Sequence, residues 1–172
     1  MKTWADSEKT NLFGGEATTK DSLRIDACGD VDELNSFLGL ARARLDDKEV
    51  DAILRDVQRD LFIIGADLAK AGSREKAVLT KEHVKKLEDM VHKIEKDLPK
   101  LTKFILPSGT HAAALLHVSR SVCRRAERKC FALKKKEIVN EDIIKYLNRL
   151  STLLFDLARL ANKKAGVKED EW

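Results

Sequence analysis

Apolar residues recur every three to four positions over most of the chain, the spacing that gathers side chains on one face of an α-helix. This pattern predicts five helices, over about residues 30–44, 48–71, 80–98, 110–135 and 140–165. Because the helices are joined by short links, we expect an all-α fold, an up-and-down five-helix bundle of the ferritin-like or four-helix-bundle type.

Residues at the predicted helix ends support these boundaries. Asp30 or a neighbour could cap the first helix, and Thr80 and Asn140 are suitable N-caps for the third and the fifth. Gly72 is expected to stop the second helix and Pro99 to stop the third.

The first 30 residues have weak helical periodicity and contain Gly14 and Gly15, so they predict a long loop. A loop of this length in a compact domain is usually functional or disordered. We expect one domain over residues 1–172, with the loop at 1–30, the helical bundle at 31–165 and a short tail at 166–172.

Composition agrees with a helical protein that has no membrane span. Apolar residues make up 43% of the chain and charged residues 36%, with 5% aromatic residues. No apolar run approaches the roughly 20 residues of a membrane span, and the first residues lack the apolar core of a signal peptide. We therefore expect a cytoplasmic location. The net charge of +4 does not by itself imply nucleic acid.

Several kinds of chemistry find no support in the sequence. Cys28, Cys123 and Cys130 suggest neither a disulfide framework nor a zinc site, and buried reduced thiols are expected instead. No Glu is followed by a His three positions later, as a di-iron bundle would need, so no metal site is expected. The nucleophile signature Gly-x-Ser-x-Gly and the Walker A sequence are also absent.

The fourth predicted helix carries a narrow polar face, here called the arginine face. At about 100° per residue, its members fall within an arc of roughly 100°: they are His117, Arg120, Arg124, Glu127 and Arg128. The opposite arc is apolar, with Leu115, Val118, Val122, Ala126 and Leu133. Like charges along one face cost a few tenths of a kcal/mol per pair, which a bound polyphosphate would offset.

The helix pattern alone leaves two interpretations of the arginine face open. Arg120 or Arg128 could pair with carboxylates of a neighbouring helix or subunit, with Asp32 and Glu33 as candidates. Phosphate binding is favoured by the amino-terminal segment, which offers glycine amides and basic side chains, although a solvated basic tail would look similar. Its candidate residues are Asp6, Thr10, Gly14, Gly15, Lys20 and Arg24.

Five ordered blocks, between about residues 10 and 160, resemble the PduO-type ATP:cob(I)alamin adenosyltransferases. They are Arg24-Ile-Asp-Ala-Cys-Gly-Asp-Val-Asp-Glu-Leu-Asn-Ser, Leu61-Phe-Ile-Ile-Gly-Ala-Asp-Leu-Ala, Phe104-Ile-Leu-Pro-Ser-Gly-Thr, Val122-Cys-Arg-Arg-Ala-Glu-Arg and Tyr146-Leu-Asn-Arg-Leu-Ser.

The resemblance implies a homotrimer with an active site at each subunit interface, where ATP sits under the amino-terminal loop and against the fourth helix. It implies that Lys20 and Arg24 serve the triphosphate, that Arg124 and Glu127 contact ATP, and that Asn148 helps to fix the nucleotide. Asp32 and Arg120 match a pair that bridges subunits.

The implied reaction transfers the 5′-deoxyadenosyl group of ATP to the Co(I) of a reduced corrinoid and releases triphosphate. Co(I) is itself the nucleophile, so no catalytic base is needed. Phe104 would press against the lower face of the corrin and remove the axial ligand. The resemblance also implies Mg²⁺ on the phosphates, and suggests a corrinoid reductase and a cobalamin-dependent enzyme as partners.

This chain departs from the family pattern mainly near its amino terminus. Ala5 and Glu8 replace two glycines of the phosphate loop, and Glu8 places a negative charge where phosphates would approach. Ser108 stands for a glycine and Thr152 for an aspartate. Two alternatives follow: a non-catalytic relative that delivers ATP or a corrinoid to a partner enzyme, and a basic helical scaffold that binds nucleic acid.

Overall fold

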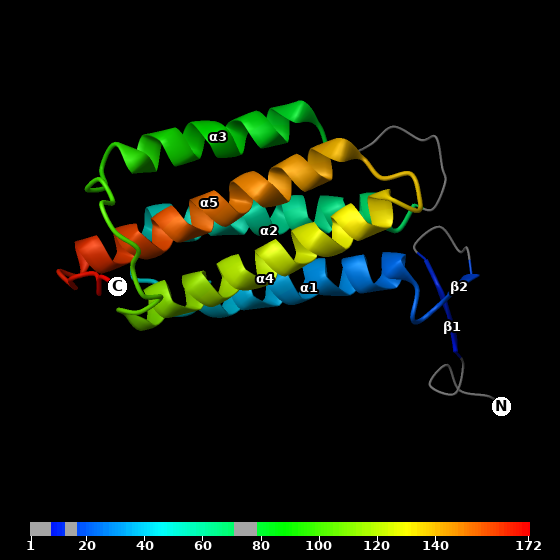
Figure 1. The fold of residues 1–172 in the computed structure, drawn as a ribbon, viewed down its shortest axis with the longest axis horizontal. Helices are drawn as coiled ribbons and strands as arrows, with labels where there is room; N and C mark the ends of the chain where they lie inside the picture. Colours follow the sequence, from blue (N-terminus) through cyan, green and yellow to red (C-terminus); the bar gives the residue numbers. More distant parts are fainter. Residues whose placement is uncertain (1–7, 13–16, 71–78) are drawn as a thin grey trace.

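The computed structural model describes residues 8–12, 17–70 and 79–172, and within them the predicted five-helix bundle is confirmed (Figure 1). The helices are α1 (Leu23–Arg42), α2 (Lys48–Leu68), α3 (Lys81–Glu95), α4 (His111–Lys134) and α5 (Glu141–Lys164). Two short strands, β1 (Lys9–Asn11) and β2 (Ala17–Thr19), form an antiparallel pair before α1.

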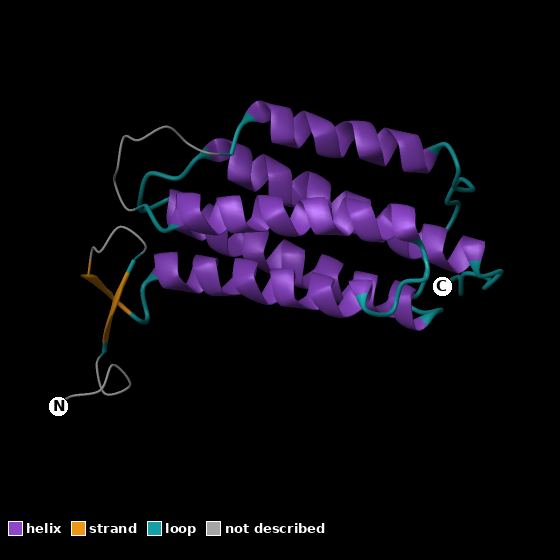
Figure 2. Cartoon of the chain, turned by 180° about the vertical axis from the view of Figure 1, so that it is seen from behind, coloured by secondary structure: helices purple, strands orange, loops and turns teal. Residues whose placement is uncertain are grey.

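The helices enclose one continuous apolar core. α1 packs against α2 and α4, and α5 packs against α4 and α3 (Figures 1 and 2). The ion pairs Asp26–Lys129 and Glu33–Arg125 run in opposite chain order, so α1 and α4 are antiparallel. The largest fully buried side chains come from every helix except α3, with Leu34, Leu61, Leu116 and Tyr146 among them.

Most predicted helix ends are close to those observed, but the first helix begins earlier than expected. Ser22, not a residue near Asp30, is the N-cap, because its hydroxyl accepts a hydrogen bond from the Ile25 amide. Thr80 and Asn140 cap α3 and α5 as predicted. α2 ends at Leu68 and α3 at Glu95, each about one turn short of the prediction. Gly72, the predicted stop of the second helix, lies outside the described residues.

The prediction of a continuous loop over residues 1–30 is therefore wrong in two places. Residues from Leu23 onward are helical, and Thr10 lies opposite Thr18 in the β1–β2 pair. The pair extends beyond the amino end of α1, at one end of the bundle (Figure 1). A three-residue strand is too short to show alternation in a sequence.

The inner face of α4 differs in part from the predicted apolar arc. Val118 is 42% exposed, whereas Cys123 and Cys130 are fully buried and carry free thiols. The Cys123 thiol donates to the Leu147 carbonyl over 3.2 Å, and burial raises the pKa of Cys130 to about 12. The expectation of buried reduced thiols is confirmed for these two, while Cys28 is only partly buried.

A membrane-crossing helix is not found among the described residues, since none of their helices is both long and apolar enough.

The buried carboxyl group of Asp156 on α5 should make the stability of the fold depend on pH. It is 5% exposed, and within the described residues its Oδ2 has no hydrogen-bond partner. Burial, reinforced by Glu95, raises its pKa from 3.8 to about 6. The folded state therefore holds this proton more tightly than the unfolded state, and Asp156 makes the fold less stable as pH rises from about 4 to above 6.

Asp156→Asn should consequently stabilise the protein at pH 8, by about 1–2 kcal/mol, and change little at pH 4. Urea unfolding of both proteins at the two pH values measures this difference. An equal effect of the substitution at both pH values would contradict the assignment.

Candidate functional site

The arginine face of α4 presents two guanidinium groups that no other described residue neutralises. Arg124 and Arg128 are exposed, and neither guanidinium group forms an ion pair or a hydrogen bond within the described part of the chain. Arg120 is half-buried, and its Nε is buried without a partner there. Burial, together with the charge of Arg124, lowers the pKa of Arg120. This surface therefore favours an anion.

Three acidic residues of α1 pair with a different side of α4 and therefore do not neutralise this face. Glu33 and Asp30 both contact Arg125, the latter at 3.4 Å, and Asp26 contacts Lys129 at 2.8 Å. Glu33, a candidate partner of Arg120 or Arg128, thus binds Arg125 instead. Asp32 is exposed and has no ion pair within the described residues of its own chain.

Glu127 and Asn148 are brought together by the packing of α4 on α5. The Asn148 side-chain Nδ2 donates to Glu127 Oε1 over 2.9 Å, and the Arg149 guanidinium donates to Asn148 Oδ1 over 2.9 Å. Both residues line an open cleft of about 410 Å³, completed by Val84, Glu88, Ile144, Lys145 and Arg149. Two residues expected to contact a nucleotide therefore share one cleft beside the exposed arginines.

An aromatic side chain that no sequence pattern indicated lies beside the amino end of the arginine face. Phe155 of α5 meets the His117 ring edge-on, with centroids 5.8 Å apart, and lies 5.9 Å from the Arg120 guanidinium carbon. His117 is 3% exposed, and neither ring nitrogen has a partner among the described residues. Burial, and then Arg120, lower its pKa, so the imidazole is neutral near pH 7.

Phe104 lies in the connector between α3 and α4 and is not a core residue. Its side chain is 79% exposed and meets the ring of Trp172, itself 84% exposed, at a centroid distance of 6.4 Å. The carboxyl-terminal segment, predicted only as a tail, pairs with this connector. The Leu106 amide donates to the Asp170 carbonyl over 2.8 Å, and the Trp172 amide donates to the Phe104 carbonyl over 3.0 Å.

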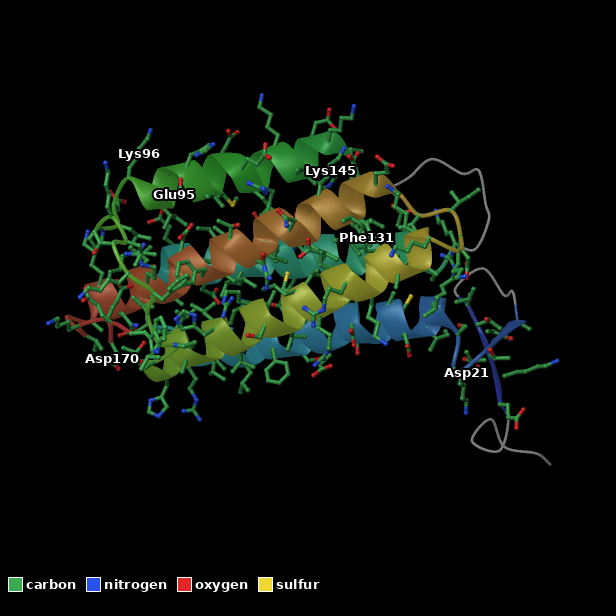
Figure 3. All side chains as sticks on the ribbon, in the orientation of Figure 1. Asp21, Glu95, Lys96, Phe131, Lys145 and Asp170 are labelled. Atoms are coloured by element: carbon green, nitrogen blue, oxygen red, sulfur yellow. The ribbon has the colours of Figure 1, made fainter. Side chains whose placement is uncertain are left out.

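The connector and the β1–β2 pair lie at opposite ends of the bundle. Asp170, next to the connector, and Asp21, next to β2, mark these two ends in Figure 3. α4, which runs between them, has 24 residues and is about 36 Å long. Phe104 and the β1–β2 pair of one chain are therefore too far apart to contact one small molecule.

The amino-terminal candidates have different surroundings. Arg24 is 4% exposed and pairs with Glu137 at 2.6 Å, while it also donates to the Leu68 carbonyl. Lys20 follows the β1–β2 pair, and its amide donates to the Glu8 carbonyl over 2.9 Å. Asp6, Gly14 and Gly15 lie outside the described residues. A role of these side chains at a triphosphate stays a prediction.

A protein-built metal site is not found in the described ranges, where no three His, Cys, Asp or Glu side chains are grouped suitably.

Comparisons with known proteins converge on one family. The family model described as cobalamin adenosyltransferase matches residues 3–161. A corrinoid adenosyltransferase of Bacillus subtilis (strain 168) is 43% identical over 171 residues, which cover 97% of this chain and 88% of that protein. A cobalamin adenosyltransferase of Cupriavidus metallidurans is 44% identical over 168 residues, covering 97% and 90%.

Solved structures show the same similarity. A phenylalanine-to-alanine variant of a PduO-type ATP:corrinoid adenosyltransferase from Lactobacillus reuteri, complexed with cobalamin and ATP, superposes with a TM-score of 0.93 at 32% identity, covering 98% of this chain and 96% of that one. An arginine-to-lysine variant of that enzyme, complexed with ATP, gives a TM-score of 0.92 at 31% identity, covering 98% and 97%.

Proposed function

This chain belongs to the cobalamin adenosyltransferase family, and we propose that it transfers the 5′-deoxyadenosyl group of ATP to the Co(I) centre of a reduced corrinoid. The observation that carries this proposal for the chain's own residues is the exposed pair Arg124 and Arg128 on α4. The same helix carries Glu127, which is hydrogen-bonded to Asn148 of α5. Together they offer cations for a polyphosphate and hydrogen-bonding groups for a nucleoside.

In the proposed reaction, the electron pair of Co(I) attacks the C5′ carbon of ATP. A cobalt–carbon bond forms, the bond from C5′ to the phosphate oxygen breaks, and triphosphate leaves with the electron pair. Arg124 and Arg128 stabilise the charge of the departing triphosphate. The protein removes no proton in this step.

We propose that each active site forms between two subunits of a homotrimer. The separation of Phe104 from the β1–β2 pair supports this arrangement, because one chain cannot bring both to one pair of substrates. Unfilled bonding groups support it as well: Asp32 is exposed without an ion pair in the described chain, and Arg120 Nε is buried without a partner there. A carboxylate of a neighbouring subunit would satisfy Arg120.

Replacing Asp32 with asparagine should loosen this assembly. The Arg120 charge, buried in the proposed interface, would lose its partner, and such a loss costs about 3–5 kcal/mol. Sedimentation velocity at micromolar concentration measures the oligomer. Glu33→Gln is the matched control, because Glu33 is adjacent on α1 but binds Arg125 of the same chain. A wild-type protein that is monomeric and fully active would refute the trimer.

Mg²⁺ is proposed as a companion of ATP. Because the described residues hold no cluster of carboxylates or imidazoles for it, the phosphate oxygens and water would supply most of its ligands, as Mg²⁺ commonly prefers. The residues present are thus compatible with a metal that arrives with the nucleotide.

We further propose a single adenosyltransferase domain and a cytoplasmic location. A corrinoid reductase and a cobalamin-dependent enzyme are the expected partners, because Co(I) must be generated and the product is a cofactor.

Ala5 and Glu8, which replace loop glycines of the family pattern, are expected to weaken ATP binding.

The proposed activity is tested by incubating the protein with ATP, Mg²⁺ and chemically reduced cobalamin. We expect the absorbance of the cobalt–carbon product to develop with stoichiometric release of triphosphate. Equilibrium binding of ATP and corrinoid without turnover would overturn the proposal and support the non-catalytic alternative.

A further inference from the structure

Arg159 on α5 is a buried cation that contacts two other segments of the chain and one aromatic ring of its own helix. It is 6% exposed, and its Nε donates to Glu169 Oε1 over 2.7 Å. One terminal nitrogen donates to the Pro99 carbonyl over 2.8 Å and to Glu169 Oε2 over 3.3 Å. The third contact is with Phe155, whose ring centroid lies 5.9 Å from the guanidinium carbon.

Two of these contacts fix the segments that present Phe104. Pro99 lies at the start of the α3–α4 connector, and Glu169 lies in the carboxyl-terminal segment. The two segments also bind each other, through the backbone bonds at Leu106 and Trp172 that form an isolated bridge between Ile105 and Glu171. Arg159 thus anchors the connector and its partner segment to the same turn of α5.

The third contact links this anchor to the arginine face. Phe155 lies between Arg159 and Arg120, at 5.9 Å from each guanidinium carbon, and also meets His117. The position of the Phe104 connector is therefore coupled, through buried Arg159 and partly buried Phe155 of α5, to the helix that carries Arg124.

We propose that Arg159 is a positioning residue for the corrinoid: it holds the connector and the carboxyl-terminal segment so that Phe104 and Trp172 stand together at the corrinoid site. This inference rests on the proposed function. An arginine is needed because its planar fork can bond Glu169 through two nitrogens and still reach the Pro99 carbonyl, which a lysine ammonium cannot do.

Hydrogen exchange tests the anchor without any substrate. In Arg159→Lys and in Glu169→Gln, peptides covering residues 100–110 and 166–172 should exchange faster than in wild type, because the amides of Leu106 and Trp172 are bonded between these segments. Arg42→Lys is the matched control, since Arg42 makes a similar fork with Asp51, at 2.7 and 3.2 Å, but its side chain bonds neither the connector nor the carboxyl-terminal segment. Unchanged exchange in both Arg159→Lys and Glu169→Gln would overturn the anchor.

Kinetics and spectroscopy test the positioning role. Both variants should raise the KM for the corrinoid about tenfold or more and reduce the yield of four-coordinate Co(II) corrinoid in the presence of ATP. The KM for ATP should change less than about twofold, and the Arg42→Lys control should match wild type in every readout. Faster exchange without a change in the corrinoid KM or in the Co(II) spectrum would overturn the positioning role.

Failure of the proposed function gives a different result. If wild-type protein neither binds the corrinoid nor adenosylates it, the proposed function is wrong, while the exchange comparison still decides whether Arg159 anchors the two segments. Glu169→Gln keeps the inference testable if Arg159→Lys does not fold, because Glu169 lies in the carboxyl-terminal segment outside the bundle.

Discussion

Replacing Phe104 with alanine should lower the rate of adenosylation about 100-fold while leaving the melting temperature close to that of wild type. The side chain is 79% exposed, so its removal opens no cavity in the core, where truncation of a phenylalanine would cost about 3–5 kcal/mol. ATP binding should be unchanged, because Phe104 lies at the end of α4 opposite to the β1–β2 pair.

The spectrum of the Co(II) corrinoid provides the decisive measurement for Phe104. With ATP present, wild-type protein should produce the four-coordinate form and Phe104→Ala should leave the five-coordinate form. Phe62→Ala is the matched control, because Phe62 is 72% exposed but belongs to α2. A Phe104→Ala protein that unfolds, or that yields the four-coordinate spectrum at the wild-type level, would disprove the role.

Arg124→Ala should lower kcat/KM for ATP about tenfold or more, because a hydrogen bond to a charged group typically contributes about 1.5–3 kcal/mol. The bundle should remain folded, since the Arg124 side chain is exposed and bonds to no other residue in the described part of the chain. Steady-state kinetics at varied ATP and saturating corrinoid measure the change.

Arg55→Ala controls for the loss of a surface arginine, because Arg55 is exposed and forms only a pair with Asp51 on α2. Arg124→Lys separates charge from geometry: it should recover part of the activity if charge alone matters and little if two oxygens must be bound together. Wild-type kinetics in a folded Arg124→Ala protein would exclude the proposed contact.

The helices were predictable from the sequence because leucine, isoleucine and valine repeat at helical spacing with polar residues at the caps. The beginning of α1 was missed for a physical reason. Its first turns bury Arg24 and the small Ala27, which carry little apolar signal. Similarly, α4 buries Cys123, Cys130 and Ser119. Because the predicted apolar arc left these residues out, it placed the core-facing side of the helix too close to Val118, which is exposed.

The arginine face was predictable as a face, but its surroundings depended on tertiary packing. The choice of Arg125, rather than Arg120, as the partner of Glu33 depends on how α1 is rotated against α4. Phe155 and Arg159 were missed because an aromatic and a basic residue four positions apart on a helix carry no recognisable motif. The pairing of residues 170–172 with the connector is a contact between segments about 65 positions apart, which no local pattern encodes.

The distance between the two ends of each subunit has a genetic consequence for the proposed trimer. A chain with a damaged amino-terminal segment would still contribute an intact Phe104, and a chain lacking Phe104 would still contribute an intact amino terminus. When two such inactive chains are co-expressed, random mixing leaves roughly a quarter of the interfaces with both contributions intact. Two loss-of-function alleles at opposite ends of the bundle should therefore complement each other, whereas two alleles at the same end should not.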